Sequence, residues 1–281
     1  METSEHSTTV RCHTVHEYLA YSLRLVISVL MIAMVYIAFV YMPVTYGDWY
    51  KFFKPASLAI SDPYEINGVL NPPWAFVLLY PLAQLPGRLS GAGLALLSII
   101  AVVMYARSPW KALAICASAP FVFVIVLGQL DALILFGFIL PESISSLLIL
   151  VKPQGAFLTI LNRLNIKSLV VLAVSVILSL GVWNLWPIKV LRYGLIPDVL
   201  RNASLFPYSL PIAFILAYYG VRRRSDALLC WATLCAVPFF QTHSILPAIA
   251  TSIHEVKDWR IWLLLPILSW FYYAFYVGWV N

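Results

Sequence analysis

The chain has 281 residues, of which 62% are hydrophobic and only 11% are charged. Its mean hydropathy of +0.88 excludes an ordinary soluble globular domain. Long apolar runs without period-two alternation predict an all-α, polytopic membrane helical bundle rather than a barrel. The formal net charge of +6 comes from short basic clusters between apolar runs, which are typical of cytoplasmic loops, so we expect no nucleic-acid partner.

The apolar runs divide the chain into blocks, each a predicted helix or pair of helices. These blocks are residues 20–43, 72–86, 89–106, 110–127, 129–141, 143–162, 168–187, 208–221, 226–242, 244–254 and 259–280. A span needs about 20 apolar residues, so the shorter blocks are predicted to be half-helices, re-entrant pairs or kinked segments. We therefore expect about eight to ten transmembrane or re-entrant helices in a single integral membrane domain over residues 1–281.

Basic residues set the predicted orientation of a multi-pass protein in the cell membrane. The clusters that we place in the cytoplasm are Arg163 with Lys167, Arg222 to Arg224, and Lys257 with Arg260. The polar N-terminal tail at residues 1–17 is also placed there, and the first apolar block is expected to stay as an uncleaved anchor. Residues 44–74 and 188–207 are then extracytoplasmic loops, although Lys189, Arg192 and Arg201 go against this assignment. The topology between residues 72 and 127 stays open.

The predicted loop at residues 44–74 gathers charged side chains in a chain that has few of them. They are Asp48, Lys51, Lys54, Asp62 and Glu65. Trp49, Tyr64 and Trp74 in the same loop could stack against a sugar face. The alternative is an ordinary interfacial loop whose aromatic rings lie at headgroup level. If the loop is functional, it presents a carboxylate to a polar substrate at the membrane surface.

Three polar sites interrupt the later apolar blocks, and ionisable residues at membrane depth mark functional sites. Gln129 and Asp131 open a helix, where Asp131 either caps free amides or lines a binding cavity. Lys152 and Gln154 flank a helix-breaking proline, and Lys152 either binds a lipid-linked phosphate or snorkels at a helix end. His243 separates two apolar blocks, and a single histidine in that position is more often a packing residue than a catalyst.

The sequence contains no glycine-rich phosphate loop, no Ser/His/Asp arrangement and no zinc-protease motif. Its four cysteines have no metal-ligand spacing, so we expect no structural zinc and no disulfide framework. No cofactor and no metal-binding residues are predicted, and metal dependence stays open. Because no soluble nucleotide-binding domain is predicted, an activated donor would be borne by the membrane.

Several short motifs follow one another in a defined order. They are Gly47-Asp48-Trp49, Asp62-Pro63-Tyr64, Asn71-Pro72-Pro73-Trp74, Gly128-Gln129 and Val151-Lys152-Pro153-Gln154. In this order and spacing, residues 46–161 resemble the membrane glycosyltransferases of the C superfamily, and most closely glycosyltransferase family 87. The resemblance implies a helical bundle of that superfamily, and transfer of a sugar from a polyprenyl-phosphate donor to an extracytoplasmic glycan or lipid acceptor, with inversion.

The resemblance also implies roles for single residues. Asp48 is expected to be the general base that takes a proton from the acceptor hydroxyl, and Lys152 is expected to neutralise the departing lipid phosphate. The residues expected to contact substrate are Trp49, Lys51, Lys54, Tyr64, Asn71, Trp74, Gln129, Asp131, Lys152, Gln154 and His243. Membrane lipids are the remaining expected partners. This mechanism requires Asp48 and Lys152 to meet at one polar pocket on the same side of the membrane.

Two other functions stay open. A transporter or flippase for a lipid-linked or small anionic solute would use Lys152 and Asp131 as a binding site at a helix break. The sequence shows no internal repeat of the kind many transporters have, which favours the transferase. Residues 141–152 look compressed relative to the family, so a catalytically inactive membrane relative is the other alternative.

Overall fold

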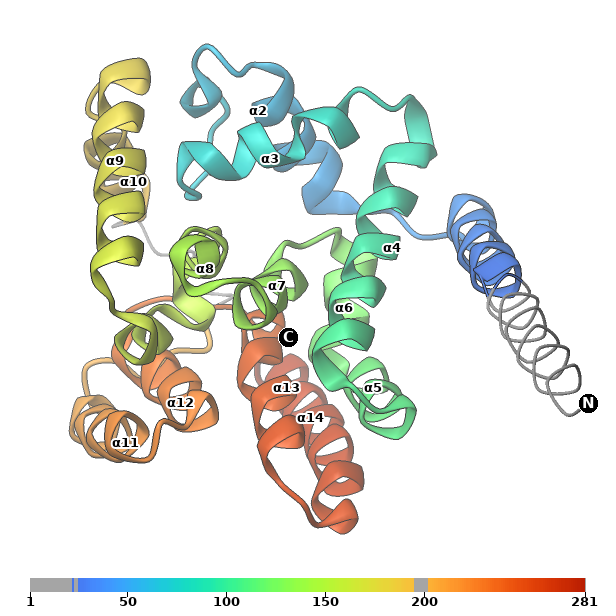
Figure 1. The fold of residues 1–281 in the computed structure, drawn as a ribbon, viewed down its shortest axis with the longest axis vertical. Helices are drawn as coiled ribbons and strands as arrows, with labels where there is room; N and C mark the ends of the chain where they lie inside the picture. The colour runs from blue at the N-terminus through green and yellow to red at the C-terminus, as the bar shows by residue number, and fades with distance from the viewer. Residues whose placement is uncertain (1–21, 23–24, 195–201, 281) are drawn as a thin grey trace, which may run out of the picture. The chain divides into compact units, whose positions relative to one another are not determined.

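The computed structural model describes residue 22 and residues 25–194 and 202–280; the predicted tail at residues 1–17 lies outside these ranges. Every regular element in the described ranges is a helix, which confirms the predicted all-α class. The chain divides into two compact units, Met1–Pro43 and Val44–Asn281. The described helix of the first unit is Leu25–Tyr41, and all further elements belong to the second unit (Figure 1).

The first half of the second unit follows the predicted apolar blocks from residue 72 onward, whereas the predicted loop at residues 44–74 contains short helical elements between Trp49 and Glu65. Its elements are η1 (Trp49–Phe53), α2 (Lys54–Leu58), η2 (Pro63–Glu65), α3 (Pro73–Ala83), α4 (Gly87–Ala106), α5 (Pro109–Cys116), α6 (Ala119–Leu127), η3 (Asp131–Leu133) and α7 (Ile134–Ile139). The predicted block 110–127 is two helices, α5 and α6, bent by 68° at the break between them. Pro120 stands in the first turn of α6, where its missing N–H needs no partner, so a new helix starts there.

The second half contains a helix break where the sequence predicts one. Its elements are α8 (Glu142–Ile149), η4 (Pro153–Gly155), η5 (Phe157–Arg163), α9 (Ile166–Trp183), α10 (Trp186–Gly194), α11 (Leu210–Arg223), α12 (Asp226–Ala236), η7 (Thr242–Ile245), α13 (Leu246–Glu255) and α14 (Trp259–Val280). Lys152 has φ −143° and ψ 82°, a non-helical conformation that the following proline favours. The predicted block 143–162 is therefore interrupted at Lys152.

The second predicted loop also contains a helix. Residues 188–207 were expected to form a loop, but α10 occupies residues 186–194, and residues 195–201 lie outside the described part of the chain. The helix is amphipathic, with one apolar side, so its average hydropathy is too low to stand out as a block. Only the periodicity of its apolar residues could have indicated it.

Among the described residues, two helices are long and apolar enough to cross a membrane, and the bent α5–α6 pair would make a third. These two are α4 and α9, and they differ in how much of each lies against protein. In α4, 61% of the apolar window is buried inside the structure, whereas in α9 only 11% is. An apolar helix that exposes most of its side chains needs an apolar environment outside the protein.

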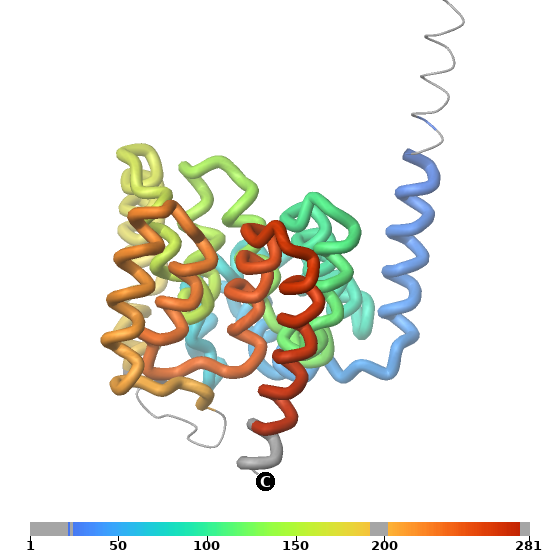
Figure 2. Tube along the Cα trace, turned by 90° about the horizontal axis from the view of Figure 1, so that it is seen from below, coloured from blue at the N-terminus to red at the C-terminus, as the bar shows by residue number. Residues whose placement is uncertain are grey.

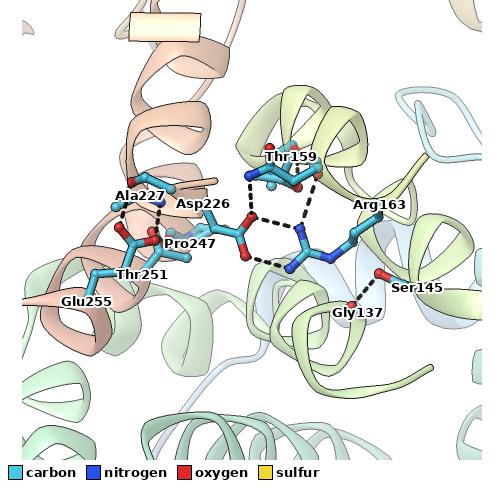
Figure 3. A network of polar contacts seen from close by, with 12 residues as sticks. Gly137, Ser145, Thr159, Arg163, Asp226, Ala227, Pro247, Thr251 and Glu255 are labelled. Carbon is cyan, nitrogen blue, oxygen red and sulfur yellow. Dashed lines mark hydrogen bonds and ion pairs between the residues drawn. The ribbon is translucent and has the colours of Figure 1, made fainter. Parts of the chain in front are cut away.

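Helices α11, α12 and α13 pack against one another in sequence order (Figures 1 and 2). Arg163 at the end of η5 forms a bidentate ion pair with Asp226 at the start of α12 (Figure 3). Its Nη1 lies 2.7 Å from Oδ1, and its Nη2 lies 2.5 Å from Oδ2. Glu255 at the end of α13 accepts a hydrogen bond from the Ala227 amide at 2.9 Å, so two acidic side chains stand at the N-terminus of α12. Arg163 is thus a structural residue rather than a free loop charge.

Arg163→Ala should lower the free energy of unfolding by about 2–3 kcal/mol, because it leaves Asp226 without its counter-ion. This value is discounted from that of a fully buried pair, since the two side chains are 12% and 20% exposed. Thermal melting of the purified chain in detergent measures the change. Arg88→Ala, at an exposed position, is the matched control and should melt like the parent. Equal melting of the two variants would contradict a stabilising role for the pair.

Candidate functional site

The loop that carries Asp48 is anchored on the start of α4. Trp49 is fully buried, and its Nε1 donates to the Ser90 hydroxyl at 3.0 Å. Lys54 donates from Nζ to the Leu85 carbonyl at 2.8 Å and lies 3.2 Å from the same hydroxyl. Trp49 and Lys54, both expected to contact substrate, are therefore engaged with protein. Their contacts leave Asp48, at the start of η1, half-buried and fixed in position.

Asp48 and Lys152 are joined through a single side chain, that of Gln129. The Gln129 amide donates to Asp48 Oδ2, and its carbonyl oxygen accepts from Lys152 Nζ. Lys152 Nζ also lies 2.7 Å from Asp131 Oδ2. Gln129, Lys152 and Asp131 are 5%, 4% and 0% exposed, respectively, so three of these four side chains are inside the protein.

His243 completes this cluster. Its Nδ1 lies 3.0 Å from Asp131 Oδ2 and 3.2 Å from Lys152 Nζ, and its Nε2 lies 2.8 Å from the side-chain oxygen of Gln241. We call Asp48, Gln129, Asp131, Lys152 and His243 the polar network. It contains two carboxylates and one ammonium, so its net charge is −1 when His243 is neutral. Asp131 Oδ1 is buried without a hydrogen-bond partner in the described part of the chain, and such an acceptor suits a water or a ligand hydroxyl.

Backbone geometry places Gln129 in the network. Gly128 ends α6 in the left-handed conformation, with φ +69°, and this turn directs the chain toward η1. A Cβ atom at Gly128 would lie only 2.6 Å from the Cβ of Trp49. Glycine is the residue that allows both the positive φ and this close approach.

Two other loop residues hold the segment that carries Lys152. Asn71 is buried and donates from Nδ2 to the Val151 carbonyl at 2.7 Å, directly before Lys152. Trp74 donates from Nε1 to the Leu147 carbonyl at 3.0 Å in α8. The predicted loop is thus connected to the Lys152 segment in two ways. Asp48 is linked to the Lys152 side chain through Gln129, and Asn71 binds the backbone carbonyl of Val151.

Tyr64 holds Asn71 in place through a hydrogen bond to its backbone. Its hydroxyl donates to the Asn71 carbonyl at 2.9 Å, and its ring stacks on Trp186 with centroids 6.1 Å apart. Burial, together with the nearby Asp62 carboxylate, raises the pKa of Tyr64, so the phenol keeps its proton and stays a donor. Asn71, Trp74 and Tyr64 are placed to orient other residues, whereas a direct contact with substrate stays a prediction.

The remaining predicted residues lie outside the polar network. Lys51 is exposed, with its ammonium 5.0 Å from the centre of the Phe52 ring, and Gln154 is half-buried in η4. The Ser90 hydroxyl accepts hydrogen bonds from both Trp49 and Lys54. This role was not predicted, because nothing in the sequence distinguishes a single serine near the start of a helix. The pair between Lys189 and Asp62, 2.7 Å apart, did have a signal, since Lys189 went against the charge asymmetry.

Two cavities stand out, and neither is lined by the polar network. One, of about 350 Å³, is mostly apolar, and Phe240 and Ile245 in its wall flank the segment that carries His243. The other, of about 790 Å³, lies between the loop at η2 and the corner of α9 and α10. That Asp48 and Lys152 share an open cavity therefore stays a prediction, although one hydrogen-bonded network joins them. In the described ranges, no three His, Cys, Asp or Glu side chains form a group able to hold a metal ion.

No protein-family model, no curated protein and no solved structure matches the chain. The resemblance to membrane glycosyltransferases therefore rests on the ordered motifs alone.

Gly128→Ala should destabilise the protein by about 2 kcal/mol or more, because alanine disfavours positive φ and its methyl group would collide with Trp49. Gly181→Ala is the matched control, since a Cβ there meets nothing within 4 Å in the last turn of α9. The control should be neutral or slightly stabilising, as is usual for glycine to alanine inside a helix. Chemical or thermal unfolding in detergent compares the two, and equal stability would show that the turn at Gly128 is not constrained.

Proposed function

We propose that this protein is a multi-pass membrane glycosyltransferase, which transfers a sugar from a polyprenyl-phosphate donor to an extracytoplasmic glycan or lipid acceptor with inversion. The observation that supports it most is the direct link from Asp48 through Gln129 to Lys152. A general base and a cation for the leaving phosphate are the two groups that this reaction needs. Here both belong to one connected set of side chains.

Asp48 suits the base because it is the half-buried member of the network and so the one within reach of an acceptor. It would take the proton from the acceptor hydroxyl while that oxygen attacks the anomeric carbon. The new bond from oxygen to carbon forms as the bond from carbon to the phosphate oxygen breaks, and the electron pair leaves with the phosphate. The amide of Gln129 donates to Asp48 and holds its carboxylate in one orientation.

Lys152 suits the leaving group, but the contacts that it already makes set a condition. An ammonium has three N–H donors, and Lys152 has three neighbours within hydrogen-bond reach: Gln129, Asp131 and His243. A phosphate that binds Lys152 must replace one of them. The contact of Lys152 with His243, at 3.2 Å, is longer than its contact with Asp131, at 2.7 Å. His243 is therefore more readily replaced than Asp131. Asp131 would stay as the fixed counter-ion.

The apolar cavity next to the His243 segment supports a lipid-borne donor. Its wall includes Phe240 and Ile245, the residues on either side of the segment 241–244. An apolar space whose wall adjoins the segment carrying His243, a neighbour of Lys152, is compatible with a ligand that carries a phosphate on a hydrocarbon chain.

A transporter for an anionic solute is the second candidate, and one observation favours it. Asp131, Lys152 and His243 form a closed group with almost no exposure at a point where helices are interrupted. Ionisable groups in such positions also mark solute and proton pathways. In that case Asp48 would be a peripheral residue, and its removal would leave transport intact.

Asp48→Asn should lower transfer by about 10²–10⁴-fold, because the amide cannot accept the acceptor's proton. The full chain is reconstituted in liposomes with polyprenyl-phosphate hexoses or pentoses and an envelope lipid extract as acceptor, and released polyprenyl phosphate is measured. Lys152→Met should lower release to a similar extent. The matched controls are Asp258→Asn and Lys257→Gln, exposed changes of the same charge, which should keep the parent rate.

Two results would contradict the proposed transferase activity. Release by Asp48→Asn at the parent rate would remove the base from the mechanism. Movement of the intact lipid-linked sugar across the bilayer by the parent chain, without any release of polyprenyl phosphate, would favour the transporter.

A further inference from the structure

The larger cavity, of about 790 Å³, is separate from the polar network. It is lined by Asp62, Tyr64, Glu65, Leu180, Asn184, Leu185, Ile188 and Lys189. These residues come from two places in the chain, the loop at η2 and the corner between α9 and α10. The cavity therefore exists only because the fold brings these two segments together.

Specific contacts hold the two sides of the cavity in place. Lys189 Nζ lies 2.7 Å from Asp62 Oδ2, and Trp183 Nε1 donates to the Ile60 carbonyl at 2.6 Å. Asn184, in the wall, has φ +51° and ψ −150°, a conformation that is essentially reserved for glycine. Strained residues of this kind persist where the surrounding structure imposes them, and they are concentrated at ligand sites.

The cavity presents charges of both signs. Asp62 and Lys189 are 37% and 41% exposed, and an ion pair so exposed contributes little to stability. A ligand that carries a cation and an anion could replace each partner at small cost. Glu65 adds an exposed carboxylate that has no ion-pair partner among the described residues. Two carboxylates and one ammonium favour a ligand with a strongly hydrogen-bonding cation.

The rest of the wall is aliphatic. Leu185 and Ile188 are 63% and 53% exposed, and they continue the exposed apolar surface of α9. Hydrocarbon chains pack well on such a surface, whereas a sugar ring prefers an aromatic face. Among the described residues, Tyr64 is the only aromatic residue that lines the cavity, and its ring is already stacked on Trp186.

We propose that this cavity binds the headgroup of a zwitterionic phospholipid with a primary ammonium, of the phosphatidylethanolamine type. The lipid phosphate pairs with Lys189, the ammonium donates to Asp62 and Glu65, and the acyl chains lie along Leu185, Ile188 and α9. A trimethylammonium headgroup has no N–H to donate and would need an aromatic cage, which the described residues of the cavity wall do not form. An anionic headgroup without a cation would face two carboxylates. This site does not depend on the proposed transferase activity.

Native mass spectrometry of the full chain in detergent tests the proposal by titration with dioleoyl phosphatidylethanolamine, phosphatidylcholine and phosphatidylglycerol. Phosphatidylethanolamine should bind at least about fivefold more tightly than the other two, which is equivalent to about 1 kcal/mol. Glu65→Gln should remove most of this preference without loss of stability, because Glu65 makes no ion pair with the described residues. Asp62→Asn should act in the same direction, and Lys257→Gln, at an exposed position away from the cavity lining, should change nothing.

Water-soluble glycerophosphoethanolamine, which has the headgroup but no chains, distinguishes a lipid site from a site for a free metabolite. It should bind at least about tenfold more weakly than the lipid, since it lacks the apolar contacts. Equal binding of the soluble headgroup and the lipid would overturn the proposal, as would equal affinities for the three lipids. A preference that survives both Glu65→Gln and Asp62→Asn would also overturn it. None of these outcomes depends on sugar transfer.

Discussion

The buried ammonium of Lys152 imposes the strongest physical demand in this structure. An ion taken out of water costs several kcal/mol unless opposite charge and hydrogen bonds surround it. Lys152 meets this demand with Gln129 and Asp131, which follow α6, and with His243, which follows α12. The breaks that follow α6, α8 and α12 therefore converge on one point, where hydrogen bonds and an ion pair join them in addition to apolar packing.

Much of the helical framework could be predicted because its signals are local. Apolar blocks, and prolines such as Pro120 and Pro153, mark helices and their breaks without knowledge of the partners. Most of the polar network was also foreseeable. Few ionisable side chains lie inside the apolar blocks, and a buried charge needs a partner of opposite charge. Asp131 and Lys152 are such a pair, 2.7 Å apart.

The roles of the loop side chains could not be predicted, because composition does not distinguish a ring that meets a ligand from one that meets protein. Trp49 looked like a residue for stacking on a sugar, yet it is buried and bonded to Ser90, which only the path of α4 could reveal. Lys189 is the converse case. As a loop charge it conflicted with the expected orientation, but its pair with Asp62 shows that a basic residue can be retained for a contact instead of for topology.

Tyr64 lies between the large cavity and the segment that carries Lys152. Its ring lines the large cavity, while its hydroxyl holds Asn71, which in turn holds the carbonyl before Lys152. Three short links thus connect a wall of one site to the backbone of the other. An occupant that displaced the ring would break the hydrogen bond from the Tyr64 hydroxyl to Asn71 and so remove one support of the segment that precedes Lys152. If occupancy of the cavity changed the affinity at Lys152 in this way, thermodynamic reciprocity would require the reverse effect to be equal.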